Sequence, residues 1–452
     1  MKNIFYLKKN DTLKKAFMLL KGQLGATIFI LDKKKILLGV VTDGDLRRSI
    51  ARGSSLNLHV QEVMNKNAIY VFEDELKSKR FIKSKIDLGA MMDRPLIIPV
   101  LNKKKKFLYS INTEKFLEIS QNKKIKERII SFKKPHILVV GGAGYIGSVL
   151  TRALLKKNWK VKVVDNFLYE KNSLTSFKKN KNLFIIRKDI CDLNVQIDAV
   201  KDVDAVVFLA EIVGDPSCAA KPEDAIKTNY LAVSSLASLC SYMNINRFVY
   251  TSSCSVYGAK QGESKLLTEN SALNPTSHYA RIKIMSEKAV LSKSNLFFSP
   301  TILRLATVFG KSFRNRFDLV VNIFARNAHY HKKIKVNGGN QWRPNIHVED
   351  VSSAIIRVLE SPINKVENKI FNLCNDTQNY TINNISKIVK SVFPQCKIIK
   401  EYKNVDKRNY KVSSKKISDI INFKAKRTIK YSLGELKKFF KGKKVNYFFK
   451  KK

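Results

Sequence analysis

A tyrosine and a lysine four residues apart form the clearest chemical pair in this sequence, in the segment 279–283 (YARIK). On a helix, Tyr279 and Lys283 would share one face, so that the ammonium lies near the phenol. A nearby cation lowers the pKa of a phenol, which makes tyrosine a usable proton acceptor near neutral pH. Earlier in the chain, a strand-like run ends in two hydroxyl residues, Ser252 and Ser253. These residue types together predict proton transfer to and from a bound hydroxyl group.

Glycines follow directly after a short apolar run at 137–140, in the segment 141–147 (GGAGYIG). The apolar run is typical of a buried parallel strand, and a helical pattern follows the glycines. In this context Gly141 would make a tight turn, Gly144 would let the backbone approach a pyrophosphate, and Gly147 would let the helix pack on the strand. The N-terminus of the helix would offer N–H groups to phosphates. The alternative is an ordinary tight turn without a ligand.

A second strand is expected at 160–164, and it ends in Asp165. A carboxylate about 20 residues beyond such glycines is suited to binding the ribose hydroxyls of adenosine. Because this carboxylate would repel a 2′-phosphate, the pattern favours NAD over NADP as the cofactor. Further strands at 183–186 and 205–209 alternate with helical segments, which predicts a doubly wound parallel sheet of the α/β class.

Residues 10–50 show a smaller pattern of helix, strand, strand and helix. Asp11 or Thr12 can cap the first helix. The two strands are expected at 26–31 and 36–42, with a lysine-rich turn between them. This pattern predicts a separate α+β domain ahead of the parallel sheet.

The segment 39–47 (GVVTDGDLR) resembles the signature of a CBS domain. In that family the Thr-x-x-Asp pair holds a nucleotide, with the hydroxyl and the helix N-terminus on phosphate and the acid on ribose. The resemblance therefore implies an adenine nucleotide at Thr42 and Asp45. The alternative is that these two residues only cap the helix and bind no ligand.

A second CBS unit is expected, because these units occur in pairs. It would begin at 60–65 and continue in strands at 95–101 and 107–111. The positions that match the ligand pair hold Asn112 and Lys115, so at most one conventional nucleotide site is expected. The pair could also serve only in dimerisation, and a homodimer is the expected assembly.

Residues 136–440 resemble an extended short-chain dehydrogenase/reductase of the NAD-dependent epimerase/dehydratase family, whose members modify nucleotide sugars. The glycine motif, Asp165, the serine pair and the Tyr-x-x-x-Lys pair carry the resemblance. It implies that Tyr279 is the general base and acid, and that Lys283 anchors ribose and lowers the pKa of the tyrosine. It implies that Ser253 hydrogen-bonds the substrate, with a slip of one residue to Ser252 left open.

The same resemblance implies a wider set of binding residues. Asn322 falls in a segment that resembles the loop contacting the sugar nucleotide. Arg343 would grip the diphosphate, a role suited to a planar guanidinium, and Arg408 is a second candidate. The alternative for each arginine is a surface ion pair. The predicted cofactor contacts are Gly141, Gly144, Tyr145, Ile146, Gly147, Asp165, Asp189, Ile190, Ala210 and Lys283.

Two departures from the family pattern bear on the reaction. Glu211 stands where a small residue usually follows the strand, and a carboxylate beside the nicotinamide would be unusual. Cys254 and Ser255 replace the Asp-Glu pair that supplies the acid and base of 4,6-dehydratases. Their presence argues against the elimination of water.

The amino-acid composition limits the kinds of partner and the location that we expect. The formal net charge is +48, but the excess is mostly lysine spread along the chain, so we interpret it as solvated surface with weak non-specific attraction to polyanions and expect no specific nucleic acid. No run approaches the ~20 apolar residues of a membrane span, and no signal-peptide pattern opens the sequence, so a cytoplasmic protein is expected. Six cysteines without a C-x-x-C pair and six scattered histidines predict neither a disulfide nor a metal site.

The sequence thus predicts a Rossmann-type doubly wound sheet with a smaller C-terminal substrate lobe, preceded by a CBS pair. The expected domains are a CBS pair at 1–118, a linker at 119–134, a catalytic domain at 135–440 with its lobe mainly at 310–345 and 375–440, and a basic tail at 441–452. The expected function is a nucleotide-sugar epimerase acting at C4 through a keto sugar, regulated or assembled by the CBS pair. The alternatives are a dehydrogenase, reductase or dehydratase of the same family, and an inactive nucleotide sensor.

Overall fold

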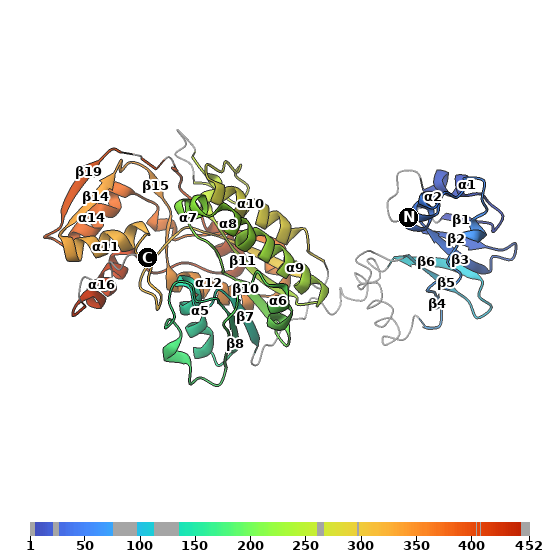
Figure 1. Ribbon diagram of the computed structural model, residues 1–452, viewed down its shortest axis with the longest axis horizontal. Helices are drawn as coiled ribbons and strands as arrows, with labels where there is room; N and C mark the ends of the chain where they lie inside the picture. The colour runs from blue at the N-terminus through green and yellow to red at the C-terminus, as the bar shows by residue number, and fades with distance from the viewer. Residues whose placement is uncertain are drawn as a thin grey trace. The chain divides into compact units, whose positions relative to one another are not determined.

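The computed structural model divides into two compact units, residues 1–127 and 128–452 (Figure 1). The structure describes residues 5–20, 27–75, 97–112, 135–259, 266–295, 298–403, 405–406 and 408–443. The predicted linker, Lys115 and all but three residues of the predicted basic tail lie outside these ranges. Each unit is described by itself.

The first unit contains two copies of one strand arrangement. The strands of the first copy are β1 (Phe5–Leu7), β2 (Thr27–Leu31) and β3 (Leu37–Thr42), and those of the second are β4 (Val71–Phe72), β5 (Ile97–Leu101) and β6 (Phe107–Asn112). In both copies the first strand pairs parallel with the second, and the second pairs antiparallel with the third. The helices α1 (Leu13–Leu19) and α2 (Asp43–Ala51) belong to the first copy. This repeat is the strand arrangement expected of a CBS pair.

The second unit is built on a seven-stranded sheet in the order β17-β12-β11-β10-β7-β8-β9. Every neighbouring pair in it is parallel. The strands are β7 (His136–Val140), β8 (Lys160–Val164), β9 (Leu183–Ile186), β10 (Ala205–Phe208), β11 (Arg247–Ser253), β12 (Ser299–Leu305) and β17 (Lys369–Leu373). This is the predicted doubly wound sheet. Its strands are mostly apolar because both of its faces are covered.

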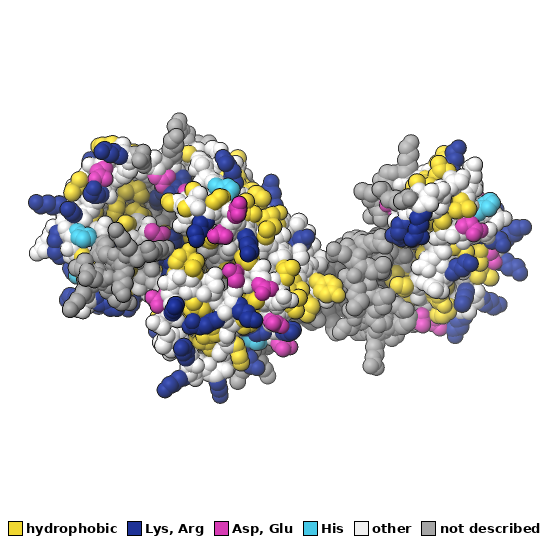
Figure 2. Space-filling view, in the orientation of Figure 1, with side chains coloured by type: hydrophobic (Ala, Val, Ile, Leu, Met, Phe, Trp, Pro, Cys, Tyr) yellow, Lys and Arg dark blue, Asp and Glu magenta, His cyan; other side chains and the backbone are white. Residues whose placement is uncertain are grey.

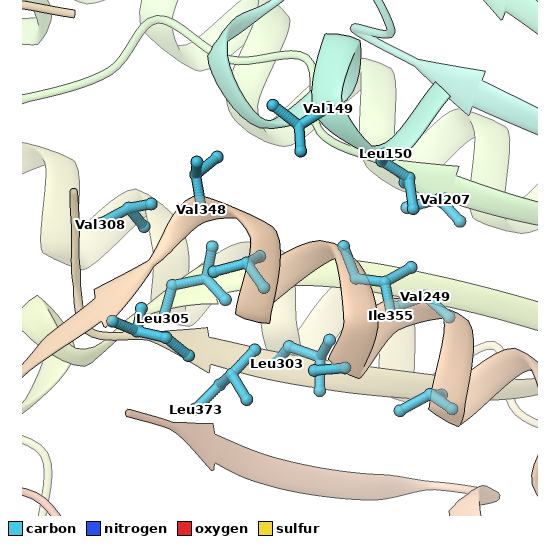
Figure 3. Close-up of a cluster of buried hydrophobic side chains, with 14 of the residues drawn as sticks. Val149, Leu150, Val207, Val249, Leu303, Leu305, Val308, Val348, Ile355 and Leu373 are labelled. Carbon is cyan, nitrogen blue, oxygen red and sulfur yellow. The ribbon is translucent and has the colours of Figure 1, made fainter. Parts of the chain in front are cut away.

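Helices cover the two faces of this sheet, and successive strand residues point to opposite sides. On one side, residues such as Val207, Leu303 and Phe371 pack with α5 (Tyr145–Lys156) and α12 (Val348–Glu360), as Figure 3 shows in part. On the other side, their neighbours pack with α6 (Leu193–Val200) and α9 (Ala232–Tyr242). Between α6 and α9, the chain forms α7 (Asp215–Ala220), α8 (Pro222–Ile226) and a π-helical turn, Lys227–Leu231.

A smaller lobe has an apolar core of its own. Its main elements are α11 (Val320–His331), β14 (Lys333–Asn337), α14 (Ile382–Val392), β19 (Lys397–Glu401) and α16 (Ile429–Phe440). The strands β14 and β19 pair parallel. Short pairs join the lobe to the rest of the unit, β13 (Thr307–Phe309) with β16 (Asn345–His347) and β15 (Trp342–Arg343) with β18 (Tyr380–Thr381). The lobe is therefore assembled from segments far apart in the sequence.

The surface charges, the cysteines and the helices can be described for the residues that the structure covers. On the face shown in Figure 2, Lys and Arg side chains are scattered rather than gathered in one patch. All six cysteines are free thiols. Within the described ranges, no helix is long and apolar enough to cross a membrane, and no group of acidic, His and Cys side chains could hold a metal ion.

Truncation of a core side chain on α12 should destabilise the second unit. Ile355 is fully buried, so Ile355→Ala should lower the free energy of unfolding by about 2–5 kcal/mol. Both tryptophans of the chain, Trp159 and Trp342, lie in this unit, so their fluorescence during urea unfolding reports on it alone. Leu193→Ala, at a side chain that is 62% exposed, should change the unfolding midpoint little. Equal midpoints for the two variants would contradict the packing described here.

Candidate active site

The turn between β7 and α5 has a shape that only glycine permits. Gly141 has φ +80°, and a Cβ there would lie 2.6 Å from the backbone nitrogen of Ala210. A Cβ on Gly147 would collide with the carbonyl oxygen of Gly141. Gly144 is the N-cap of α5, and no side chain caps this helix. The N–H groups of this helix N-terminus are suited to phosphates, and their contact with a cofactor stays a prediction.

Asp165 lies at the end of β8 and is tied to this turn. Its Oδ2 accepts a hydrogen bond from the Ala143 nitrogen (2.9 Å), and its Oδ1 accepts one from the Phe167 nitrogen (2.7 Å). Burial raises the pKa of its carboxyl group. The glycine shape, the uncapped helix and this carboxylate together fit the adenosine and pyrophosphate of NAD.

Of the other predicted cofactor residues, Ala210 and Ile146 lie at this turn, and Ile190 lies in the adjoining core, while Asp189 is exposed. The backbone of Ala210 packs directly against Gly141, since a Cβ on that glycine would lie 2.8 Å from the Ala210 Cα. Ile190 is buried, and Asp189 accepts a hydrogen bond from the backbone two residues further on (2.9 Å). Ile146 packs against the core beneath α5.

Ser253, Tyr279 and Lys283 come together at the carboxyl end of β11. Tyr279 and Lys283 both lie on α10 (His278–Leu291), and both are buried. Ser253 ends β11, and its hydroxyl lies close enough to the phenol of Tyr279 to influence the pKa of that tyrosine. The neighbouring Ser252 instead donates to the buried Glu287 (2.5 Å). The geometry therefore favours Ser253 over Ser252 as the hydroxyl beside Tyr279.

Burial opposes ionisation of both members of the Tyr-Lys pair. It raises the pKa of Tyr279, against the opposing effect of the nearby Arg316, and it lowers the pKa of Lys283. The ammonium of Lys283 donates to the Thr251 carbonyl (2.5 Å) and to the Tyr250 hydroxyl (3.2 Å). It also forms an ion pair with Glu211. These three partners match its three N–H donors, so a ribose could be anchored here only by exchanging one of them.

A second buried ion pair lies beneath the site. Arg304 on β12 binds Glu287 of α10 through two nitrogens, with Nη2 to Oε2 at 2.7 Å and Nε to Oε1 at 3.0 Å. Its Nη1 donates to the Tyr257 hydroxyl (3.1 Å), which donates to Asn372 (2.6 Å). This network was not predicted from the sequence, although a charged residue inside an apolar segment, such as Arg304 in β12, is a signal of a buried ion pair. The network fixes Ser252 and α10 against the sheet.

The two predicted diphosphate arginines are brought together by an aspartate. Asp406 binds Arg343 (Nη2 to Oδ2, 2.8 Å) and Arg408 (Nη2 to Oδ2, 2.5 Å). Arg408 also pairs with Asp215 of α7 (3.1 Å). Burial opposes ionisation of Asp406, but the two arginines hold its pKa well below the usual range. Sequence analysis predicted the arginines and missed both aspartates.

Asn322 and Tyr145 lie together in the interior. The Asn322 amide accepts a hydrogen bond from the Gly310 nitrogen (3.0 Å) and donates to the Arg316 carbonyl (2.9 Å) and the Tyr145 hydroxyl (3.1 Å). Tyr145 donates in turn to the Gly310 carbonyl (2.8 Å). In this arrangement Asn322 holds the loop that carries Arg316, and its contact with a sugar nucleotide stays a prediction.

Comparisons with known proteins agree with this geometry. Residues 137–374, more than half of the chain, match the NAD dependent epimerase/dehydratase family, and residues 1–52 match the CBS domain. An uncharacterized UDP-glucose epimerase of Bacillus subtilis is 31% identical over 50% of this chain and 73% of its own length. A UDP-N-acetyl-alpha-D-glucosaminuronate decarboxylase of Bacillus cytotoxicus is 27% identical over 51% of this chain and 73% of its own.

The fold also matches solved structures. The UDP-glucuronic acid 4-epimerase of Bacillus cereus, in complex with UDP-glucuronic acid and NAD, superposes with a TM-score of 0.61 at 23% identity. The match covers 68% of this chain and 99% of that one. It shows that the second unit has the fold of that enzyme.

The glycine turn offers a direct test of the cofactor site. Gly147→Ala should weaken NAD binding at least tenfold, because the added methyl collides with the turn that carries the pyrophosphate. The measurement is titration of NAD into the purified protein by calorimetry. Gly434→Ala, on α16 with open space around its Cβ position, is the matched control and should bind NAD as the wild type does. Unchanged affinity in the first variant would contradict this placement.

The glycine turn, the buried Tyr-Lys pair and the match over residues 137–374 lead to one assignment. The first copy of the N-terminal repeat matches the CBS domain in the same way. The chain belongs to the NAD-dependent epimerase/dehydratase family, uses NAD as its cofactor, and carries a CBS domain ahead of the family domain.

Proposed function

We propose that this protein is an NAD-dependent nucleotide-sugar epimerase that inverts C4 of the sugar through a keto intermediate. The observation that carries the proposal is the meeting of Ser253, Tyr279 and Lys283 beside the glycine turn. The names of relatives support the same reaction, since they include a UDP-glucose epimerase and a UDP-glucuronic acid 4-epimerase. The substrate class, a UDP-sugar, follows from those relatives.

In this mechanism the side chains bind, orient and move protons. When bound, NAD supplies the acceptor and later the donor of hydride. Tyr279 takes the proton of the C4 hydroxyl while Ser253 holds the same oxygen through a hydrogen bond. The keto sugar then presents its other face, and Tyr279 returns the proton as the new hydroxyl forms. Burial of the Tyr-Lys pair keeps water away from the keto sugar.

The arginines would hold the nucleotide end of the substrate. Arg343 and Arg408 both form ion pairs with Asp406, which places two guanidinium groups next to each other. Two neighbouring guanidinium groups are suited to binding a diphosphate. A diphosphate would take over bonds now made by Asp406 and Asp215. In this way the nucleotide would stay fixed while the keto sugar rotates to present its other face.

The end of β11 disfavours dehydration. Cys254 stands where 4,6-dehydratases have an acidic residue, and its thiol donates to the Arg304 carbonyl (3.2 Å). Burial raises the pKa of this thiol well above its usual range. A thiol in this state is neither an effective acid nor an effective base for eliminating water, which leaves epimerisation as the favoured reaction.

The test is turnover of a panel of UDP-glucose, UDP-N-acetylglucosamine and UDP-glucuronic acid, followed by proton NMR. The wild type should form the C4 epimer of one of them. Tyr279→Phe should lower the rate by about 100-fold or more, because the proton acceptor is lost, and should retain NAD. Tyr242→Phe, at an exposed tyrosine, is the control and should be fully active.

Other outcomes of this panel would replace the proposal. An oxidised sugar with NADH released would make the protein a dehydrogenase, and loss of water would make it a dehydratase. No reaction with any sugar at full NAD occupancy would favour an inactive nucleotide sensor. Full activity of Tyr279→Phe would refute the role of that tyrosine.

We further propose that the CBS pair binds an adenine nucleotide at Thr42 and Asp45. The Thr42 hydroxyl caps α2 by accepting from the Asp45 nitrogen (3.2 Å), and the Asp45 carboxylate accepts from the Thr42 nitrogen (2.9 Å). This capping box sets the hydroxyl and the acid at a helix N-terminus, the arrangement that suits phosphate and ribose. The competing account is that the cap is the whole role of the pair.

Calorimetric titration with AMP, ADP and ATP decides between these accounts. Whichever nucleotide binds the wild type should bind Asp45→Asn with at least tenfold lower affinity, because the ribose loses a charged hydrogen-bond acceptor. Asp11→Asn is the matched control, since Asp11 bonds the Lys8 nitrogen near the start of the other helix (2.7 Å) and should leave affinity unchanged. If the wild type binds none of the three nucleotides at this unit, the pair acts only as a cap.

A further inference from the structure

Glu211, the residue that departs from the family pattern, is held rigidly beside the Tyr-Lys pair. The backbone of the next residue, Ile212, is bonded twice by the fully buried Asn229, at 2.8 Å to its nitrogen and 2.9 Å to its oxygen. Asn229 comes from the π-helical turn 227–231, and its carbonyl accepts from Ser286 of α10 (2.7 Å). These bonds fix Glu211 relative to the helix that carries Tyr279 and Lys283.

The carboxylate of Glu211 faces three side chains that could exchange protons. Its Oε1 pairs with the Lys283 ammonium and accepts from the Tyr250 hydroxyl (3.3 Å). Its Oε2 accepts from the Tyr279 hydroxyl (3.4 Å). The side chains of Glu211 and Lys283 are only 7% and 1% exposed. A carboxylate this buried is retained with its charge only when it is paired and hydrogen-bonded, as it is here.

This pairing changes what Lys283 does to Tyr279. A lone ammonium beside a phenol favours the phenolate, but here the charge of Glu211 offsets that of Lys283. Around the phenol, burial and the charge of Asp215 oppose ionisation while Arg316 favours it, and the nearby thiol of Cys218 is neutral because burial raises its own pKa. Glu287 adds a second negative charge near Lys283. The charges that face Tyr279 and Lys283 therefore leave the tyrosine as a neutral phenol that donates to Glu211.

We propose that Glu211 is the proton acceptor behind Tyr279, so that Tyr279 starts as a neutral phenol and relays the proton, rather than starting as a phenolate that accepts it. As the sugar O–H bond breaks, the Tyr279 oxygen takes that proton and its own proton passes to Oε2 of Glu211. The electron pair of the sugar C–H bond leaves as hydride for the cofactor, and the carboxylate becomes a carboxylic acid. Reversal of these transfers after the sugar turns restores the carboxylate. The relay rests on the proposed function, while the neutral state of Tyr279 does not.

The titration of Tyr279 tests the proposal without a substrate. The full-length protein with NAD bound is labelled with ¹³C at Cζ of tyrosine, and Tyr279→Phe identifies the resonance. In the wild type the resonance should keep the shift of a neutral phenol from about pH 6 to about pH 10. In Glu211→Gln, no carboxylate at position 211 offsets the charge of Lys283. The midpoint of the Tyr279 titration should therefore lie at least one pH unit lower than in the wild type, which is a tenfold loss of proton affinity. Glu211→Asp, which keeps the charge, should follow the wild type.

One further variant serves as a control, and two results of the titration would overturn the proposal. Tyr250→Phe removes the neutral group on Oε1 and leaves every charge, so its Tyr279 titration should match that of the wild type. Coincident titrations of the wild type and Glu211→Gln would overturn the proposal. Ionisation of Tyr279 below about pH 8 in the wild type would overturn it too, even if Glu211→Gln fails to fold.

Turnover then tests the relay itself. With the UDP-sugar that reacts in the panel, the acid limb of the kcat profile should lie at lower pH in the wild type than in Glu211→Gln, because a carboxylate accepts protons at lower pH than a phenol. Equal acid limbs would refute the relay. If no sugar reacts, the proposed epimerase activity fails, while the NMR titration still decides the charge state of Tyr279.

Discussion

The close approach of β7, α5 and β10 at the glycine turn is the constraint on which the rest of the second unit depends. Two positions there exclude any side chain, since a methyl on Gly141 would meet Ala210 and one on Gly147 would meet Gly141. Because the strands are parallel, the same close packing brings their carboxyl ends to one edge of the sheet. Ser253 ends β11 and Glu211 follows β10 at this edge, so the glycine turn and the residues proposed for catalysis are placed by the same packing.

A second constraint is the burial of charge on α10. Lys283 and Glu287 lie one turn apart on this helix and both face inward, where each meets an opposite charge from the sheet side. Breaking a buried pair leaves an uncompensated charge, which costs about 3–5 kcal/mol. The two pairs therefore set the position of α10 against β11 and β12, and with it the position of Tyr279. Lys283, proposed to act beside Tyr279, is in this sense also one of the groups that locate the helix.

Local patterns of the sequence were enough to predict the parallel sheet, the glycine turn, Asp165 and the Tyr-Lys pair. The sheet follows from the alternation of strands and helices, the glycine turn and Asp165 from spacing within one strand–turn–helix–strand segment, and the Tyr-Lys pair from spacing within one helix. The partners of Glu211 could not be predicted, because they depend on how α10 packs beside the segment after β10. The same holds for Asp406, which lies between Arg343 and Arg408 only once the lobe has folded. Glu211 could still be singled out as unusual, since a carboxylate after a buried strand breaks the local pattern.

The ion pairs of the free site also bear on how tightly a substrate can bind. Arg343 and Arg408 already have partners in Asp406 and Asp215, so a diphosphate would exchange one set of charge-assisted bonds for another. The net gain is then smaller than the sum of the new contacts, because the displaced carboxylates must be rehydrated or paired again. In return, Asp406 holds the two arginines together before the substrate arrives. Such preorganisation favours the correct placement of the sugar over affinity alone, which suits the proposed epimerisation, in which the intermediate must turn within the site while its nucleotide stays fixed.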